Sequence, residues 1–201
     1  MAKTAFTIWI TGLSSSGKTT IAQTVTDALR ARGKQVECLD SGAIRRTINR
    51  SLGFSRDEIE TNLKRLAYDA SMLNRNGVIA VVSAVSPYRS VRDSIRQGSP
   101  GFVEVYCRCP MEVLASRDSS GLFDRAQRGE IKHVAGIDAP YEEPLKPEVL
   151  LNTDGESPDD CAAKVLGTLE LLGRIEKRES SCYTAAEEEM IKQRLQDLGY
   201  L

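Results

Sequence analysis

Short apolar runs rich in β-branched residues alternate along the chain with longer stretches in which apolar residues recur every three or four positions. The first pattern predicts strands buried on both faces, and the second predicts amphipathic helices. Their alternation is typical of an α/β domain in which helices cover a mostly parallel sheet. The predicted strands are 6–11, 35–40, 78–85, 102–107 and 149–152. The predicted helices are 18–32, a short piece after Asp40, 55–76, 88–97, 111–117 and a segment that begins at Ser157.

The periodicity fades between residues 118 and 147, where charged residues, glycine and proline accumulate. A stretch of this length without a regular pattern is more often a functional lid than a passive connection. We therefore expect a mobile lid over about 118–147. Its histidine, His133, is the only one in the chain and is expected on the lid surface.

The C-terminal part of the chain forms a second exception. After Gly173 the sequence becomes strongly polar, and a last helix is expected to begin at Thr184, with Glu187 completing its cap. Its predicted apolar face consists of Ile191, Leu195 and Leu198. This face is expected to pack on its own domain or on a second subunit, with docking of another protein as the alternative. We expect one folded domain over 1–175, followed by a polar linker and an amphipathic helix over 176–201.

The numbers of basic and acidic residues argue against binding of nucleic acid or of an anionic membrane surface. The 201 residues include 27 Lys and Arg against 28 Asp and Glu, so no overall field attracts nucleic acid or an anionic membrane. No apolar run approaches the roughly 20 residues that span a bilayer. The N-terminus leads straight into a predicted strand, without the pattern of a signal peptide. Five cysteines form neither a CxxC pair nor a secreted-type framework, which argues against structural zinc and favours the cytoplasm.

The stretch from Gly12 to Thr19 fits GxxxxGK[ST] at every specified position, between a predicted strand and a predicted helix. Glycines let backbone N–H groups surround phosphate, and the helix offers its positive N-terminal end. Lys18 supplies a point charge to the transferred phosphoryl group, and the Thr19 hydroxyl is a ligand for Mg²⁺. The residues expected to hold the nucleotide are Gly12, Leu13, Ser14, Ser15, Ser16, Gly17, Lys18, Thr19 and Thr20. The sequence thus predicts a three-layer fold of the P-loop nucleoside triphosphate hydrolase type that binds ATP and Mg²⁺.

Two observations narrow the class of P-loop protein. The chain lacks the NKxD motif with which GTPases read their base. The apolar run 78–85 ends in Ser86-Pro87-Tyr88-Arg89, whereas large ATPases usually have an acid there. A small-molecule kinase with a basic lid fits the sequence better.

Several ordered motifs resemble the adenylyl-sulfate kinase (APS kinase) family over about residues 7–152. They are the Gly12–Thr19 loop, Leu39-Asp40 with Ile44-Arg45, Leu52-Gly53-Phe54-Ser55, Asn62, Ser86-Pro87-Tyr88-Arg89, Arg117-Asp118 and Gly136-Ile137-Asp138-Ala139-Pro140-Tyr141-Glu142. The resemblance implies transfer of the γ-phosphoryl group of ATP to the 3′-hydroxyl of adenylyl sulfate, which gives PAPS. It also implies a homodimer whose partner molecule is a small nucleotide substrate.

The resemblance also implies roles for individual residues. Around the acceptor nucleotide it places Arg45, Asn49, Phe54, Asn62, Ser86, Arg89 and Lys132. Phe54 would stack on the adenine, a contact worth about 1–3 kcal/mol. Arg117 would act as a lid cation at ATP, and Asp40 would serve Mg²⁺ or accept the proton. Other interpretations are open: the three arginines could be solvated helix-face charges, Phe54 a core aromatic and Asn62 ordinary helix surface.

The sequence departs from the family pattern at four positions, all on the acceptor and lid side. Gly42 stands where the family has the aspartate that takes the 3′-hydroxyl proton, and Ile59 replaces an arginine. Val134 replaces the lid phenylalanine that would face Phe54, and Ser120 replaces a lysine. Three hypotheses follow: an APS kinase with a rearranged acceptor site, a kinase for another nucleotide or activated sugar, or a non-catalytic ATP-binding module.

Overall fold

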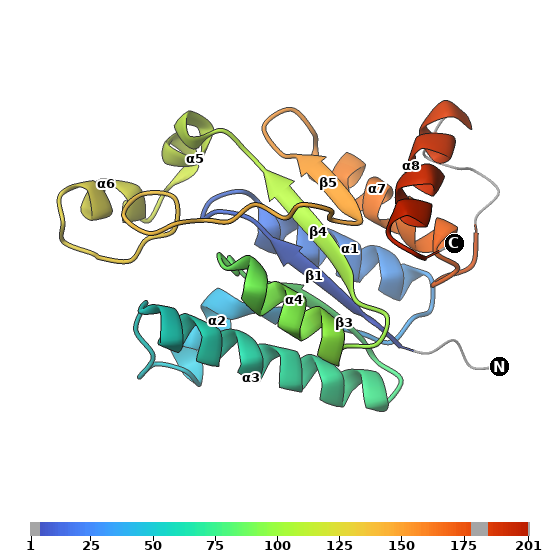
Figure 1. The fold of residues 1–201 in the computed structure, drawn as a ribbon, viewed down its shortest axis with the longest axis horizontal. Helices are drawn as coiled ribbons and strands as arrows, with labels where there is room; N and C mark the ends of the chain where they lie inside the picture. Colours follow the sequence, from blue (N-terminus) through green and yellow to red (C-terminus); the bar gives the residue numbers. More distant parts are fainter. Residues whose placement is uncertain (1–4, 178–184, 201) are drawn as a thin grey trace.

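The computed structural model describes residues 5–177 and 185–200, and its centre is a sheet of five parallel strands (Figure 1). The strand order is β2-β3-β1-β4-β5. The strands are β1 (Thr7–Thr11), β2 (Val36–Asp40), β3 (Ile79–Ser83), β4 (Val103–Arg108) and β5 (Val149–Asn152). Each lies within two residues of its predicted bounds, so the predicted five-stranded α/β fold is confirmed.

The central strand β1 carries the phosphate-binding loop at its end. It pairs with β3 on one side, where Ile8 lies opposite Val81, and with β4 on the other. All five of its residues are buried, as expected for a strand covered on both faces. The loop after Thr11 is therefore held by a rigid strand in the middle of the sheet.

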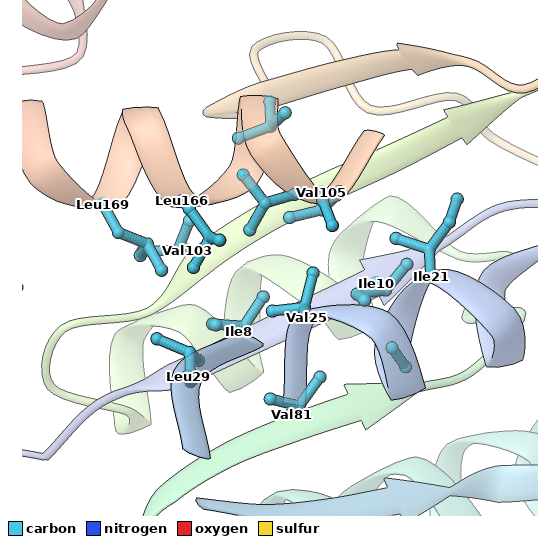
Figure 2. Packing of buried hydrophobic residues seen from close by; sticks show 14 of the residues in the cluster. Ile8, Ile10, Ile21, Val25, Leu29, Val81, Val103, Val105, Leu166 and Leu169 are labelled. Atoms are coloured by element: carbon cyan, nitrogen blue, oxygen red, sulfur yellow. The ribbon is translucent and has the colours of Figure 1, made fainter. Parts of the chain in front are cut away.

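Helices cover both faces of the sheet and give three layers. On one face α1 (Lys18–Ala31) and α7 (Pro158–Leu171) pack side by side. Figure 2 shows their apolar side chains, among them Val25 and Leu166, meeting those of β1, β3 and β4. On the other face α3 (Arg56–Arg75) and α4 (Arg89–Gly98) enclose a second cluster around Trp9.

Three short helices lie beyond the carboxyl ends of the strands (Figure 1). They are α2 (Ser41–Thr47), α5 (Met111–Arg117) and α6 (Leu122–Gln127). The last lies inside the stretch 118–147, where no helix was predicted. Asp118 initiates it, because its Oδ2 accepts a hydrogen bond of 2.8 Å from the Phe123 N–H. Phe123 and Ala126 are the buried residues of this single turn and a half, too few to produce a periodic pattern.

The C-terminal helix α8 (Ala185–Asp197) lies toward the other end of the sheet (Figure 1). Leu195 on its predicted apolar face is fully buried, so this side chain packs on its own domain. Ile191 and Leu198 are partly exposed. The predicted cap at Thr184 lies outside the described residues. No helix in the described part of the chain is long and apolar enough to cross a membrane.

Candidate active site

The phosphate-binding loop passes very close to strand β4. Gly12 has φ +150°, and a Cβ added to it would lie 2.5 Å from the carbonyl oxygen of Cys107. Only glycine fits both this conformation and this approach. Gly17, with φ +81°, then turns the chain into α1, so that the loop ends at the N-terminus of a long helix. This geometry aims backbone N–H groups and the helix dipole at one point, which suits an anion.

Lys18 lies under the loop and is buried. Its Nζ donates a hydrogen bond of 2.6 Å to the Leu13 carbonyl oxygen and lies 3.5 Å from Ser16 Oγ. Within the described part of the chain no carboxylate lies within 4 Å of this nitrogen. Burial lowers the pKa of Lys18 to about 8, although Cys107 and Asp40 act in the opposite direction. The loop thus holds a cation that an incoming phosphate would stabilise.

Thr19 and Asp40 meet at the mouth of the loop. Thr19 Oγ1 donates a hydrogen bond of 2.7 Å to Asp40 Oδ2 and lies 3.5 Å from Ser83 Oγ. The other carboxylate oxygen of Asp40 accepts a hydrogen bond of 2.7 Å from the Ala43 N–H and caps α2. One carboxylate and one hydroxyl fit Mg²⁺, which keeps most of its ligands as water and substrate phosphate. The described residues contain no group of three or more His, Cys, Asp or Glu side chains that could hold a metal ion on their own.

A cavity of about 500 Å³ opens beside the loop. Its wall contains Lys18 and Thr19 together with Arg117 from the end of α5. Arg117 is exposed, and its Nη1 donates a hydrogen bond of 2.9 Å to the Thr153 carbonyl oxygen. The structure therefore brings the predicted lid cation to the same cavity as the phosphate-binding loop.

Part of this cavity is formed by residues that no sequence motif indicated. Thr153, Glu156, Pro158 and Cys161, from the turn after β5 and the start of α7, also line it. A signal was available, because Thr153 directly follows a predicted parallel strand. The carboxyl ends of such strands share one edge of the sheet, where ligands of α/β folds bind.

Phe54 and Arg45 form a stacked pair on the other side of the loop. Phe54 is 47% exposed, and the Arg45 guanidinium lies 4.7 Å from the centre of its ring. Arg45 Nη1 donates to the carbonyl oxygens of Leu52 and Gly53, the former over 3.1 Å. Phe54 is therefore an exposed aromatic face rather than a core residue, and Arg45 is its support rather than a free surface charge.

Asn62 and Asn49 belong to a buried polar network. Each is 1% exposed, and Asn49 Nδ2 donates a hydrogen bond of 2.9 Å to Asn62 Oδ1. Asn62 Nδ2 donates to Ser41 Oγ over 3.0 Å, and Arg65 donates to Asn49 Oδ1 over 2.6 Å. Asn62 is thus not ordinary helix surface: it joins α3 to the first residue of α2, next to Asp40.

Ser86 is held in an uncommon conformation. Its φ is +47°, and for a residue other than glycine this costs of order 1–3 kcal/mol. Its Oγ accepts a hydrogen bond of 2.9 Å from Trp9 Nε1, and its carbonyl oxygen accepts one of 2.5 Å from Arg92 Nη1. Two buried partners thus hold the loop between β3 and α4.

Arg89 is turned away from the predicted acceptor residues. Its Nε and Nη2 donate to the Glu143 carbonyl oxygen over 3.3 and 3.1 Å. It lines a second cavity, of about 310 Å³, together with Arg92, Arg96 and Tyr200 and without any residue of the phosphate-binding loop. The observed contacts of Arg89 thus join it to the lid backbone and not to Phe54 or Arg45.

The lid is attached at its C-terminal end. A Cβ on Gly136 would lie 2.8 Å from Leu13 of the phosphate-binding loop, and Tyr141 Oη lies 3.0 Å from Thr11 Oγ1. Lys132 and His133 are exposed, as expected for lid residues. Val134 is buried, so at this position the lid presents no aromatic face.

The remaining departures from the family pattern also have structural explanations. Ile59 packs against the apolar cluster around Trp9 and leaves no cation at this point. Ser120 donates a hydrogen bond of 2.6 Å to Asp118 Oδ1. Burial tends to raise the pKa of Asp118, but the hydrogen bonds from Ser120 and from backbone N–H groups outweigh it and lower the pKa. A Cβ on Gly42 would lie 3.1 Å from Asp40 Oδ1 and 3.4 Å from Arg46 Nη1, so a carboxylate and a guanidinium both border the place of the missing side chain.

Three solved or sequenced proteins illustrate the similarity of this chain to known kinases. The adenylyl-sulfate kinase of Rippkaea orientalis is 44% identical over 177 residues, which cover 88% of this chain and 98% of the relative. A probable bifunctional SAT/APS kinase of Sorangium cellulosum is also 44% identical, and the match covers 86% of this chain but 30% of that longer protein. The structure of the Mycobacterium tuberculosis APS kinase CysC in complex with AMPPNP and APS has a TM-score of 0.79 and 37% identity, covering 83% of this chain and 98% of that one.

A further solved structure, the hexameric APS kinase from Thiobacillus denitrificans, has a TM-score of 0.66 and 28% identity, covering 87% of this chain and 30% of that one. The sequence model of the adenylylsulphate kinase family matches residues 4–152, which contain the phosphate-binding loop, the acceptor-side residues and the lid. This chain therefore belongs to the adenylylsulphate kinase family.

Proposed function

We propose that this protein is an adenylyl-sulfate kinase that transfers the γ-phosphoryl group of ATP to the 3′-hydroxyl of adenylyl sulfate and produces PAPS. The observation that carries the proposal is the grouping of buried Lys18, Thr19 and Arg117 around one cavity of about 500 Å³, with Asp40 hydrogen-bonded to Thr19. Phosphoryl transfer depends mainly on positioning and on neutralising charge, and these residues supply both.

On the nucleotide side, the backbone of residues 12–20 surrounds the phosphates of ATP and Lys18 neutralises the transferred group. Arg117 moves from the Thr153 carbonyl oxygen to the nucleotide. Thr19 and Asp40 would hold Mg²⁺, and the ion would supply positive charge against the negative charge that develops on the phosphates. Asp40 contacts Thr19 over 2.7 Å before any ligand arrives, so this pair is preorganised.

On the acceptor side, the exposed Phe54 ring, held by Arg45, receives the adenine. Asn49, Asn62 and Ser86 form the polar floor beside it. Arg89 turns from the Glu143 carbonyl oxygen to the sulfate-bearing end of the acceptor, and Lys132 approaches with the lid. Arg89 is exposed at its guanidinium contacts, so this turn breaks two hydrogen bonds that water readily replaces.

Asp40 is the acid best placed to accept the 3′-hydroxyl proton, because Gly42 offers no side chain. Proton removal contributes less to a loose phosphoryl-transfer transition state than to acyl transfer, so one shared carboxylate is sufficient for turnover.

We further propose that the protein is cytoplasmic and forms a homodimer, and light scattering on the purified chain tests the latter. A hexamer, as in the Thiobacillus denitrificans relative, would contradict the dimer.

The experiment that tests the function measures ADP release from Mg·ATP with and without adenylyl sulfate and identifies the nucleotide product by mass. We expect ADP release that depends on adenylyl sulfate, with PAPS as the product. ADP release without PAPS, or tight ATP binding without any turnover on adenylyl sulfate, would refute the assignment.

A second candidate, a kinase for a different hydroxyl acceptor, is favoured by one observation: Arg46 borders the place of the family's carboxylate. Gly42→Asp separates the two candidates. The glycine is exposed in the first turn of α2, where the helix dipole favours an aspartate, but the added Cβ would lie 3.1 Å from Asp40 Oδ1, so the Asp40 side chain must shift slightly. If adenylyl sulfate is the acceptor, the added carboxylate should raise kcat about 10-fold or more. A loss of activity, together with wild-type turnover of another nucleotide, would favour the second candidate.

A further inference from the structure

Arg92 is a buried arginine that lies outside the sequence motifs. It connects the loop at Ser86, between β3 and α4, with the lid. Arg92 in α4 is 2% exposed, and its guanidinium donates in three directions. Nη1 donates to the Ser86 carbonyl oxygen over 2.5 Å, Nη2 to the Glu142 carbonyl oxygen over 2.6 Å and Nε to Glu104 Oε1 over 2.8 Å. The rigid fork of an arginine fixes the relative positions of these three groups.

The carboxylate that orients Arg92 is oriented in turn by a second ion pair. Glu104 Oε2 accepts a hydrogen bond of 3.2 Å from Arg96 Nη2, one turn further along α4. Arg96 also contacts both oxygens of Glu148, over 2.5 and 3.0 Å, and the side chain of Glu148 is fully buried. A paired and hydrogen-bonded buried network of this kind permits few alternative arrangements.

The last link comes from the C-terminal tail. Tyr200 Oη accepts a hydrogen bond of 2.8 Å from Arg96 Nη1 and lies 2.8 Å from Glu148 Oε1 and 3.1 Å from the Phe102 carbonyl oxygen. Its single proton serves one of the two acceptors at a time. Burial and the neighbouring Glu148 raise the pKa of Tyr200 to about 12, so the hydroxyl keeps its proton at neutral pH.

This tail is an addition to the family domain. The family match begins at residue 4 and ends at residue 152, and the match to the Rippkaea orientalis kinase spans 177 of the 201 residues. Since few residues precede the family match, the unmatched ones belong mainly to the C-terminal end. The phenol that closes the network therefore comes from a segment outside the region that defines the family.

We propose that Tyr200 is a positioning residue for the acceptor site, which rests on the proposed function. The Tyr200 hydroxyl orients Arg96, which pairs with Glu148 and Glu104. Glu104 in turn orients Arg92. Arg92 then joins the Ser86 loop to Glu142 at the attached end of the lid. We expect Tyr200 thereby to set the affinity for the acceptor and to leave the affinity for ATP unchanged, because its hydroxyl contacts Arg96, Glu148 and Phe102, none of which lies in the phosphate-binding loop.

The chain carries its own reporter of this effect. Trp9 is the only tryptophan, it is fully buried, and its indole N–H donates to Ser86 Oγ over 2.9 Å. Quenching of its fluorescence by acrylamide reports the order of the Ser86 loop, with or without catalysis.

The test compares Tyr200→Phe, which removes one hydroxyl and keeps the ring, with Tyr68→Phe on the exposed face of α3 as the matched control. For Tyr200→Phe we expect the KM for adenylyl sulfate to rise about 3- to 10-fold, the size of effect that loss of one hydrogen bond gives. We also expect Trp9 to become more accessible to acrylamide, with an unchanged KM for ATP. Tyr68→Phe should change none of these.

Arg92→Lys is a second variant. It keeps the positive charge but removes the planar guanidinium that bonds in three directions. It should raise the KM for adenylyl sulfate and the accessibility of Trp9 at least as much as Tyr200→Phe does. If Tyr200→Phe lowers only the melting temperature, Tyr200 is a structural contact and the positioning role is refuted. The role is also refuted if the substitution changes none of these quantities. If the wild type does not act on adenylyl sulfate, the proposed function fails, while Trp9 quenching still decides the role of Tyr200.

Discussion

Lys18 is cationic in water but is held by this fold in a buried position, so its ionisation is coupled to nucleotide binding. Burial lowers its pKa from an ordinary 10.5 to about 8, which disfavours the charged form in the free protein. Phosphate oxygens reverse this effect by favouring the charge. Between pH 8 and 10.5 the free lysine is therefore mostly neutral, and binding of ATP must add a proton to it.

We predict that ATP binding takes up protons at alkaline pH. At pH 8.5 the uptake should be roughly half a proton or more per site, and at pH 7 it should fall to roughly a tenth of a proton because Lys18 is already mostly charged. Calorimetry in buffers of different ionisation enthalpy measures this number. Lys18→Met is the control and should show no uptake at either pH. Equal uptake by the wild type and the variant would show that another group titrates.

Residues differ in how far the sequence could assign them. The placement of Lys18, Thr19 and Asp40 beside one another was predictable because they belong to a contiguous motif or directly end a strand. The exposure of Phe54 and the burial of Asn62 required the structure, since both residue types occur in either environment. Arg92 was missed because its partners Ser86, Glu104 and Glu142 are scattered along the chain. One signal existed: Glu104 interrupts the apolar run 102–107, and a charge inside a buried strand requires a partner.

At the scale of elements, the start of α3 determines where Phe54 stands. Glu58 completes the capping box of this helix with Ser55, and its Oε1 also accepts a hydrogen bond of 2.9 Å from the Gly53 N–H. The hydrogen bonds from Ser55, and then those from the backbone N–H groups of Gly53 and Ser55, lower the pKa of Glu58 below its ordinary 4.5. One carboxylate thus fixes both the helix end and the residues on either side of Phe54.

We predict that Glu58→Ala weakens acceptor binding. Without the carboxylate the loop at Phe54 loses its anchor, so the KM for adenylyl sulfate should rise about 5-fold or more while the KM for ATP stays constant. Steady-state kinetics with each substrate varied separately measures the two values. Glu60→Ala is the matched control, because this glutamate lies on the same helix and pairs at the surface with Lys64 over 2.7 Å.

The loss of stability caused by Glu58→Ala should also depend on pH. Because the pKa of Glu58 is lowered in the folded state, its stabilising effect is complete above pH 4.5 and is lost as the pH falls through the lowered value. The difference in urea midpoint between the wild type and Glu58→Ala should therefore shrink below pH 4.5. A difference that stays constant down to pH 3 would mean that the carboxylate charge is not the cause.

Elements were predicted well where their pattern is strong and local. The five strands are continuous apolar runs, and α3 has both a capping box and a glycine after its end. Helix α6 escaped prediction because it has six residues and two buried side chains. The path of the lid was not predictable either, since it depends on single contacts such as Gly136 on Leu13.

At the scale of the whole molecule, the C-terminal tail lies outside the two apolar clusters. Among the described residues, neither cluster contains a side chain beyond Ile175, although Leu195 in the tail is fully buried. The domain should therefore fold without the tail, although it loses the contacts that the tail makes, among them those of Leu195 and Tyr200.

We predict that a chain ending at Lys177 still unfolds in one cooperative transition. Its melting temperature should fall by roughly 3–10 °C, because removing buried contacts of this size costs a few kcal/mol in a domain of this length. Scanning calorimetry measures the shift. Loss of the transition altogether would show that the tail belongs to the folding unit itself.

The contact between Gly12 and the Cys107 carbonyl oxygen also bears on how the protein is made. Strand β1 leaves the ribosome before its partners in β3 and β4, which follow it by roughly 70 to 100 positions, and such distant pairings form slowly. Until β4 has emerged, the run from Phe6 to Ile10 stays an uncovered apolar segment, open to chaperones and to aggregation. The phosphate-binding loop also lacks the surface that shapes it. A nascent chain therefore gains no stability from ATP until the residues of β4 up to Cys107 have been synthesised.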